Sequence, residues 1–115
     1  MKTVRALTAL LALAAAFSPS LASAERFRIF TDPGATHEIL SVDRKGRDQR
    51  IVVSKRVDRV GETYAKRLID CQLQTYQILG YGFAEQDLKR ELPNPRVEPI
   101  VAGAISEEIW RRSCR

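Results

Sequence analysis

The chain has 115 residues, of which 44% are hydrophobic and 29% are charged, and its formal net charge is +5 at neutral pH. This length predicts one domain, and so modest a positive charge gives no reason to expect nucleic acid as a partner. One histidine and two cysteines do not make a zinc site without carboxylates, and no glycine-rich phosphate loop occurs, so we expect no metal and no cofactor.

Residues 1–24 have the pattern of a secretory signal peptide. Basic residues precede a 12-residue apolar stretch at residues 6–17, and a small-x-small sequence ending at Ala24 marks a cleavage site. As a helix this stretch would span roughly 18 Å, too short for a bilayer core of about 30 Å. We therefore expect a periplasmic or secreted domain of residues 25–115, with no transmembrane segment and with a net charge of +3, since the two basic residues of the signal are lost.

The first part of this domain is predicted to consist of strands. Apolar and basic side chains alternate in residues 25–31, as in a half-buried strand, and proline and glycine in residues 32–35 predict a turn. Residues 36–42 form a second, short strand, and the polar residues 43–48 form a hairpin loop around one glycine. Residues 49–60 contain five β-branched apolar residues and form a third strand.

The hairpin loop carries three basic residues that are candidates for contact with an anionic surface. They are Arg44, Lys45 and Arg47, and Arg50 and Arg56 follow in the next strand. The alternative is a solvated loop whose charge is offset by its own two aspartates.

Residues 63–79 fit a helix and a pair of strands almost equally well. One helical face would carry the apolar set Ala65, Leu68, Ile69, Gln72, Leu73 and Tyr76. In a strand, Arg67 interrupts the apolar face, and the apolar positions change parity across residues 72–75, as they do at a turn or bulge. The pattern alone leaves both structures open.

The C-terminal part is predicted to end in a short helix. Residues 83–92 hold one or two helical turns, and the prolines of residues 93–99 predict an irregular connector. Residues 100–105 are small and apolar, so we expect them to be buried. Ser106, followed by two acids, has the pattern of an N-cap for a helix that ends at Cys114.

Cys71 and Cys114 are the only cysteines, and in an exported protein we expect them to form a disulfide. The bond would close a loop of 43 residues, for which chain entropy predicts about 4 kcal/mol of stabilisation. A small domain with a marginal core benefits from such a staple. The alternative is two free thiols.

Other candidate residues give weak indications of function. His37 follows a turn, and we expect it to be exposed and without a catalytic role. Asp70 either makes a hydrogen bond at a strand end or pairs with Arg67. The aromatic residues either line a groove or pack in the core; they are Tyr64, Tyr76, Tyr81 and Trp110.

The order of several short motifs resembles known exported proteins. These motifs are Tyr64-x-x-Arg67-x-x-Asp70-Cys71, then residues 76–82, Ala104-Ile105-Ser106, Ile109-Trp110 and Cys114. The chain resembles small uncharacterised periplasmic proteins of Gram-negative bacteria. More distantly, it is similar to surface-adhesin-type exported domains, in which an Asp-Cys strand is bonded to a C-terminal cysteine. The resemblance implies strands through the central segment and no catalytic residues, but the chain lacks the early tryptophan of the adhesin type.

The sequence therefore predicts an α+β fold, a small antiparallel meander of four to five strands with a short C-terminal helix tied on by the Cys71–Cys114 disulfide. The expected function is that of a non-catalytic interaction module of the bacterial envelope. Its expected partner is another envelope protein or an anionic surface polymer. The alternative is a small periplasmic hydrolase that uses a carboxylate pair, although no spacing of acids marks one.

Overall fold

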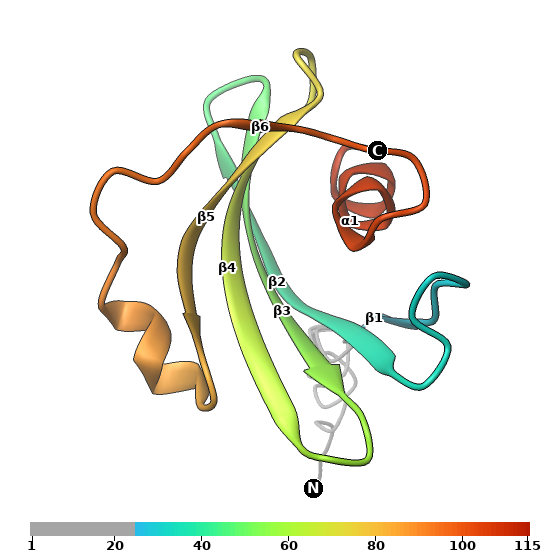
Figure 1. The fold of residues 1–115 in the computed structure, drawn as a ribbon. Coiled ribbons are helices and arrows are strands. Elements are labelled where there is room, and N and C mark those ends of the chain that lie inside the picture. The colour runs from blue at the N-terminus through green and yellow to red at the C-terminus, as the bar shows by residue number, and fades with distance from the viewer. Residues whose placement is uncertain (1–24) are drawn as a thin grey trace, which may run out of the picture.

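The computed structural model describes residues 25–115, and the predicted signal peptide lies outside the described residues. The described chain forms strands, a short 3-10 helix and one α-helix (Figure 1). The elements are β1 (Glu25–Phe27), β2 (Thr36–Lys45), β3 (Gln49–Val57), β4 (Glu62–Asp70), β5 (Thr75–Gly82), η3 (Glu85–Lys89), β6 (Glu98–Pro99) and α1 (Ile105–Ser113). None of the helices in this part of the chain is both long and apolar enough to span a bilayer.

The strands form one antiparallel sheet whose spatial order, β1 to β6, is the order of the chain. The α+β meander is thus confirmed, but it has six strands rather than four or five. The additional strand, β6, was predicted as connector because it contains Pro99. A proline without an amide hydrogen is tolerated at a sheet edge, and here the next amide, of Ile100, donates to the carbonyl of Gln74 at 3.0 Å.

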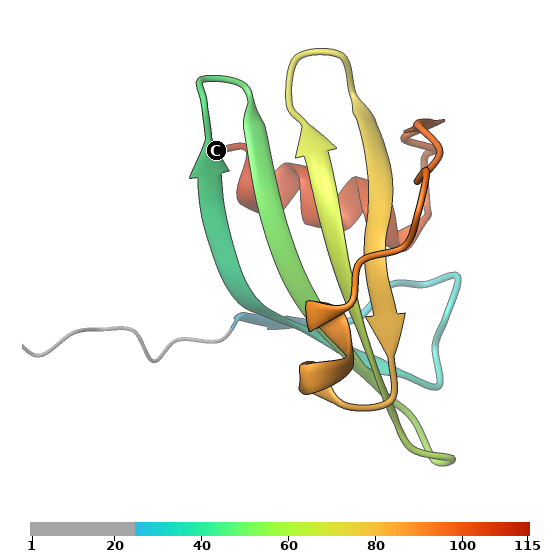
Figure 2. The same ribbon diagram turned by 90° about the vertical axis from the view of Figure 1, so that its left-hand side faces the viewer.

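Helix α1 covers one face of the curved sheet, as the two views show (Figures 1 and 2). Alternate residues of each strand point toward this helix face, because the side-chain period of a strand is two. The core between sheet and helix consists of Phe27, Ile39, Val52, Ile69 and Ile109.

The ambiguous segment forms the β4–β5 hairpin, so the strand alternative is correct. Its turn lacks the usual Asn-Gly pair, and Asp70 compensates for that: its Oδ1 accepts hydrogen bonds from the amides of Gln72 and Leu73, at 3.0 and 2.8 Å. Gln74 takes the left-handed conformation with φ of 56°. Asp70 therefore has the strand-end role. It does not pair with Arg67, which lies three residues away and on the other face of β4.

Three predicted boundaries are wrong in the first part of the domain. Strand β3 ends at Val57 instead of residue 60, because residues 58–61 form the turn into β4. Strand β1 ends at Phe27 instead of residue 31, because a turn begins at Phe30. The β2–β3 loop is shorter than residues 43–48: Asp43 to Lys45 continue β2, and only residues 46–48 turn, with Gly46 at φ of 69°. The polar side chains that suggested a loop lie on a fully exposed strand end.

The start of α1 also differs from the prediction. Ser106 is buried inside the helix, and the N-cap residue is Ala104, which has no side-chain oxygen. Glu107 takes over part of the capping, since its Oε1 accepts from the amide of Gly103 at 3.0 Å. Residues 100–105, expected to be buried, include Val101 with 59% of its surface exposed, because this segment is the crossing from β6 to α1.

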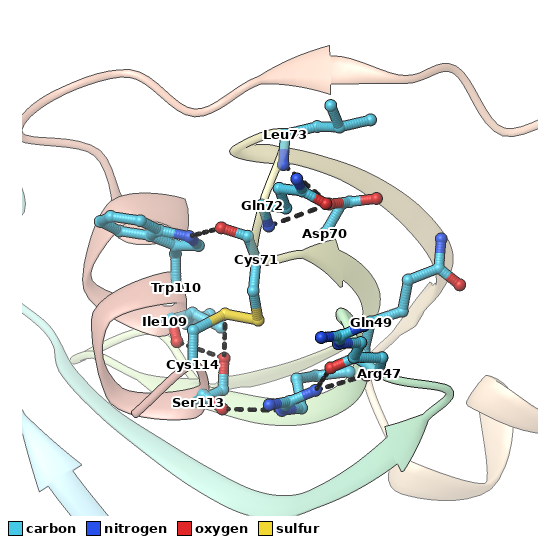
Figure 3. The surroundings of a disulfide bond; sticks show 11 residues. Arg47, Gln49, Asp70, Cys71, Gln72, Leu73, Ile109, Trp110, Ser113 and Cys114 are labelled. Atoms are coloured by element: carbon cyan, nitrogen blue, oxygen red, sulfur yellow. Dashed lines mark hydrogen bonds between the residues drawn. A yellow bond between two sulfur atoms is a disulfide. The ribbon is translucent and has the colours of Figure 1, made fainter.

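The predicted disulfide between Cys71 and Cys114 is present and joins the β4–β5 turn to the end of α1 (Figure 3). Trp110 supports the same junction by donating from its indole nitrogen to the carbonyl of Cys71 at 3.2 Å. From the other side, the Nε of Arg50 donates to the carbonyl of Ser113 at 3.1 Å. A positive charge at the carboxyl end of a helix is favourable for the helix dipole, so Arg50 has a structural role.

Candidate functional site: a pocket beneath the N-terminus of α1

A pocket of about 330 Å³ opens on the helix face, at the end of the sheet away from the disulfide. Strands β2 to β5 form its floor, and Ile29 and Ile105 contribute apolar walls from the β1–β2 segment and the first turn of α1. Its polar lining includes Arg67, Ser54 and Thr63. The pocket therefore combines an apolar wall with a cationic group.

Arg67 is the residue that interrupts the apolar face of β4 in the sequence. Its Nη1 donates to the hydroxyl of Ser54 at 2.9 Å, while its Nε is buried and has no hydrogen-bond partner among residues 25–115. No carboxylate of the described chain lies within ion-pair distance of it. Burial lowers the pKa of Arg67 to about 10, and the nearby Tyr76 and Tyr81 offset this only in part. At neutral pH it remains charged.

The second arginine of the pocket, Arg56, is fully paired. Its Nε and Nη2 donate to the two carboxylate oxygens of Asp32 at 2.7 and 2.9 Å, and its Nη1 donates to Asp58 at 2.7 Å. These hydrogen bonds are the main reason why the pKa of each aspartate is lowered, and amides of the β3–β4 turn add to the effect at Asp58. The two carboxylates also raise the pKa of Arg56.

His37 lies in the wall of the pocket, so its predicted exposure is wrong. It is the second residue of β2 and 97% buried, because its parity is that of the core residue Ile39. Its ring stacks on Phe27 at 5.5 Å, and its Nε2 lies 3.2 Å from Oδ2 of Asp32 without hydrogen-bond alignment. Burial lowers the pKa of His37, and the carboxylate of Asp32 opposes this shift.

The predicted aromatic candidates divide between groove and core. Tyr81 lines the pocket and is 53% exposed at its mouth. Tyr64 borders the pocket from β4, but its ring lies on the other face of the strand, where its hydroxyl donates to Glu62 at 3.0 Å. Tyr76 and Trp110 instead pack against the hydrophobic core. A groove role is therefore open to Tyr81 alone among these four residues.

The basic residues predicted as an anion contact do not form one site. Arg44, Lys45 and Arg47 are exposed at the β2–β3 hairpin, and none forms an ion pair within the described chain. Arg50 and Arg56 point to the helix face and are bound by carbonyl and carboxylate groups. The hairpin residues lie at the disulfide end of the sheet (Figure 1), away from the pocket.

A wider hollow of about 600 Å³ lies on the opposite face, between β3, β4 and η3. Its Lys66 is already paired with Glu91, at 2.7 Å. In the described chain no three histidine, cysteine or acidic residues cluster as metal ligands.

Sequence reasoning missed Arg67 and His37 as parts of one site. The available signal was a charged residue, Arg67, on an otherwise apolar strand face. His37 lies two strands away on the same face of the sheet, opposite Arg56. Comparison of the chain with protein-family models, with curated proteins and with solved structures gives no match.

Proposed function

We propose that this protein is a non-catalytic exported binding module whose partner places an anionic group in the pocket beside Arg67. The observation that carries the proposal is the charged guanidinium of Arg67, buried at its Nε and without a carboxylate partner in the described chain. A guanidinium in such a position favours an anion, because charge-assisted hydrogen bonds strengthen where water is partly excluded.

The energetic cost of this arrangement supports a role in binding. Leaving a buried donor unpaired costs roughly 1–3 kcal/mol, and an apolar residue at the same place would avoid that cost. The neighbouring residues of the face, Ala65 and Ile69, are apolar and buried. Local departures from a well-packed core are expected at functional sites, where stability is given up for activity.

The hydrolase alternative gains no support from the acids of this site. A general acid needs a raised pKa, so that it holds its proton at neutral pH. Asp32 and Asp58 have lowered pKa values because both accept hydrogen bonds from Arg56. These carboxylates are suited to holding Arg56 in place.

The partner that we propose is another envelope protein or an anionic surface polymer. Arg44, Lys45 and Arg47 provide a second, independent contact with such a polymer, since all three are exposed. Because they lie at the other end of the sheet, a contact there and a ligand in the pocket do not compete for space.

The test replaces Arg67 by methionine, which is apolar and of similar length. We expect acetate and inorganic phosphate to shift the backbone NMR signals of the pocket residues in the wild-type protein but not in Arg67→Met. The variant should also be more stable, by about 1 kcal/mol or more, because a buried unpaired charge is removed. That corresponds to a melting temperature raised by roughly 4–8 °C.

The matched control is Arg59→Gln, which removes one positive charge from an exposed residue of the β3–β4 turn. It should leave both anion binding and melting temperature close to wild type. Anion-induced shifts at the pocket that persist in Arg67→Met, or that disappear in Arg59→Gln, would contradict the proposal.

A further inference from the structure

We infer that the ligand of the pocket is a monocarboxylate with an apolar body, a class that includes short fatty acids, aryl acids and a peptide C-terminus ending in an apolar residue. This inference rests on the proposed function, because it specifies the anionic group that Arg67 receives. Three properties of the pocket carry it: the apolar wall, the single unmatched charge and the arrangement of donors.

The first property is the composition of the wall. Ile29, Ala65 and Ile105 provide aliphatic surface, and Tyr81, which lies opposite Ala65 on the same face of the sheet, adds an aromatic ring at the exposed mouth. A volume of about 330 Å³ lies near the lower limit of pockets that hold small organic molecules. An inorganic ion would fill little of this space and would leave the apolar wall exposed to water, whereas a ring or a short alkyl chain would cover it.

The second property is the charge balance. Two guanidinium groups and one carboxylate line the pocket, those of Arg56, Arg67 and Asp32, and Arg56 is already bound to Asp32. His37 adds no positive charge at neutral pH, because burial lowers its pKa. The charge of Arg67 is thus the one that a ligand neutralises. A monoanion matches it, whereas a phosphate dianion brings a second negative charge close to Asp32.

The third property is the arrangement of hydrogen-bond donors. Ser54 accepts from one Nη of Arg67 and so fixes the plane of the guanidinium, whose remaining donors have no protein acceptor in the described chain. A planar carboxylate complements the fork of a guanidinium better than a tetrahedral ion does when only one group is available. The hydroxyl of Thr63 lines the same pocket and makes no hydrogen bond within residues 25–115.

The experiment titrates the purified protein with five small molecules and follows the backbone NMR signals of the pocket residues. They are acetate, phenylacetate, phenylacetamide, hexanoate and inorganic phosphate. We expect phenylacetate and hexanoate to bind about tenfold or more tightly than acetate, because each buries an apolar group. Phenylacetamide has the same body without the charge, and it should bind at least about tenfold more weakly than phenylacetate.

Two further arms distinguish the source of the carboxylate. N-acetylphenylalanine represents a peptide C-terminus, and N-acetylphenylalanine amide is its uncharged control. Tight binding of N-acetylphenylalanine, without binding of its amide, assigns the pocket to a chain terminus. Hexanoate binding more tightly than N-acetylphenylalanine assigns it to a free fatty acid.

A variant of the pocket measures the contribution of the ligand's apolar body to binding separately from that of its charge. Tyr81→Ala removes a ring at the exposed mouth, so the fold tolerates it, and it should reduce the advantage of phenylacetate over acetate several-fold. Phe83→Ala is the control, since Phe83 is 78% exposed and does not line the pocket.

The outcomes distinguish this inference from the proposed function. Phosphate bound more tightly than every carboxylate, in a manner that depends on Arg67, would overturn the inference and leave the proposed function standing. Phenylacetate bound no better than acetate, or no better than phenylacetamide, would also overturn it. If none of the anions binds, both fail together.

Discussion

Three arginines on the helix face of the sheet show how far the surroundings determine the role of one residue type. Arg50 donates to the carbonyl of Ser113 at the end of α1 and to carbonyls at the β2–β3 turn, and Arg56 donates to two carboxylates. Within residues 25–115 Arg67 donates only to the hydroxyl of Ser54, and this is the arginine that we assign to a ligand. The role of a buried guanidinium can thus be assigned only when its hydrogen-bond acceptors are known.

His37 makes the stability of the protein depend on pH as the pH falls below about 7. Burial lowers its pKa in the folded state, so the unfolded chain takes up the proton first as the pH falls below about 6.5. The contribution of His37 to the free energy of unfolding is therefore complete above this pH. It is lost as the pH falls toward the pKa of His37 in the folded state. Asp32 and Asp58 have lowered pKa values, and their contribution is lost in a separate window, below about pH 4.

We expect the melting temperature to fall by a few degrees between pH 7.5 and 5.5 in the wild-type protein and to change much less in His37→Gln. His37 is the only histidine, so no other side chain with an ordinary pKa titrates in this interval. Thermal melts followed by circular dichroism at several pH values provide the measurement. An equal dependence on pH in both proteins would refute the assignment to His37.

At the scale of elements, the end of β2 is an exposed edge. Strand β1 pairs only with residues 37–39, so the following part of β2 has no neighbour on that side in the described sheet. Arg44 and Lys45 lie on this unpaired part. Positive charges at an edge discourage association with other sheets, and they also suit an anionic surface.

The surface contact is tested by reversing the charge of Arg44, Lys45 and Arg47 to glutamate. We expect adsorption to anionic vesicles or anionic polysaccharide to weaken, and the loss to be larger at low ionic strength, because exposed charges are screened by salt. Sedimentation with vesicles measures the effect. The control reverses three exposed basic residues of other elements, Arg59, Lys89 and Arg90. Adsorption that is insensitive to salt and to the first reversal would rule out this contact.

The elements differ in how well the sequence predicts them. Strand β3 was recognisable from its β-branched residues and its alternation, and the buried positions Arg50, Val52 and Ser54 have the predicted parity. Strands β4 and β5 were ambiguous, because Leu68 and Ile69 fit a helical face as well as a strand. Cross-strand pairing decides between them, and pairing is a long-range property that a local pattern does not contain.

The site was harder to predict than the fold for a related reason. The predicted cap at Ser106 failed because the residue faces the core. The predicted exposure of His37 failed because the residue shares the parity of the core residue Ile39 in β2. Arg67 was visible as an irregularity of the apolar face. Its missing acceptor becomes apparent only when β3, β4 and α1 are brought together.

For the whole molecule, the disulfide is the strongest single constraint on the position of α1. It closes a loop of 43 residues, and the chain-entropy model gives about 4 kcal/mol for a loop of that size. Both cysteines are half-buried, and Cys114 packs against the core beside Trp110, which protects the bond from exchange with external thiols. The bond is structural in this setting.

Replacing both cysteines, Cys71→Ala and Cys114→Ala, should lower the free energy of unfolding by about 2–5 kcal/mol. The melting temperature should fall by about ten degrees or more. Intact mass after alkylation of the denatured, unreduced protein verifies the bond in the purified sample. Two added alkyl groups, or an unchanged melting temperature in the double variant, would contradict this account.

The strand order of the sheet has a consequence for how the domain assembles. Each strand pairs with its neighbour along the chain, so the sheet can grow by successive local hairpins, which favours rapid folding. Helix α1 is the exception, because it packs against strands that are distant from it in the sequence. Its docking completes both the core and the Ile105 wall of the pocket. Reduction of the disulfide should therefore release α1 from the sheet before the sheet itself unfolds. The protein should then lose the proposed ligand site while the sheet is still intact.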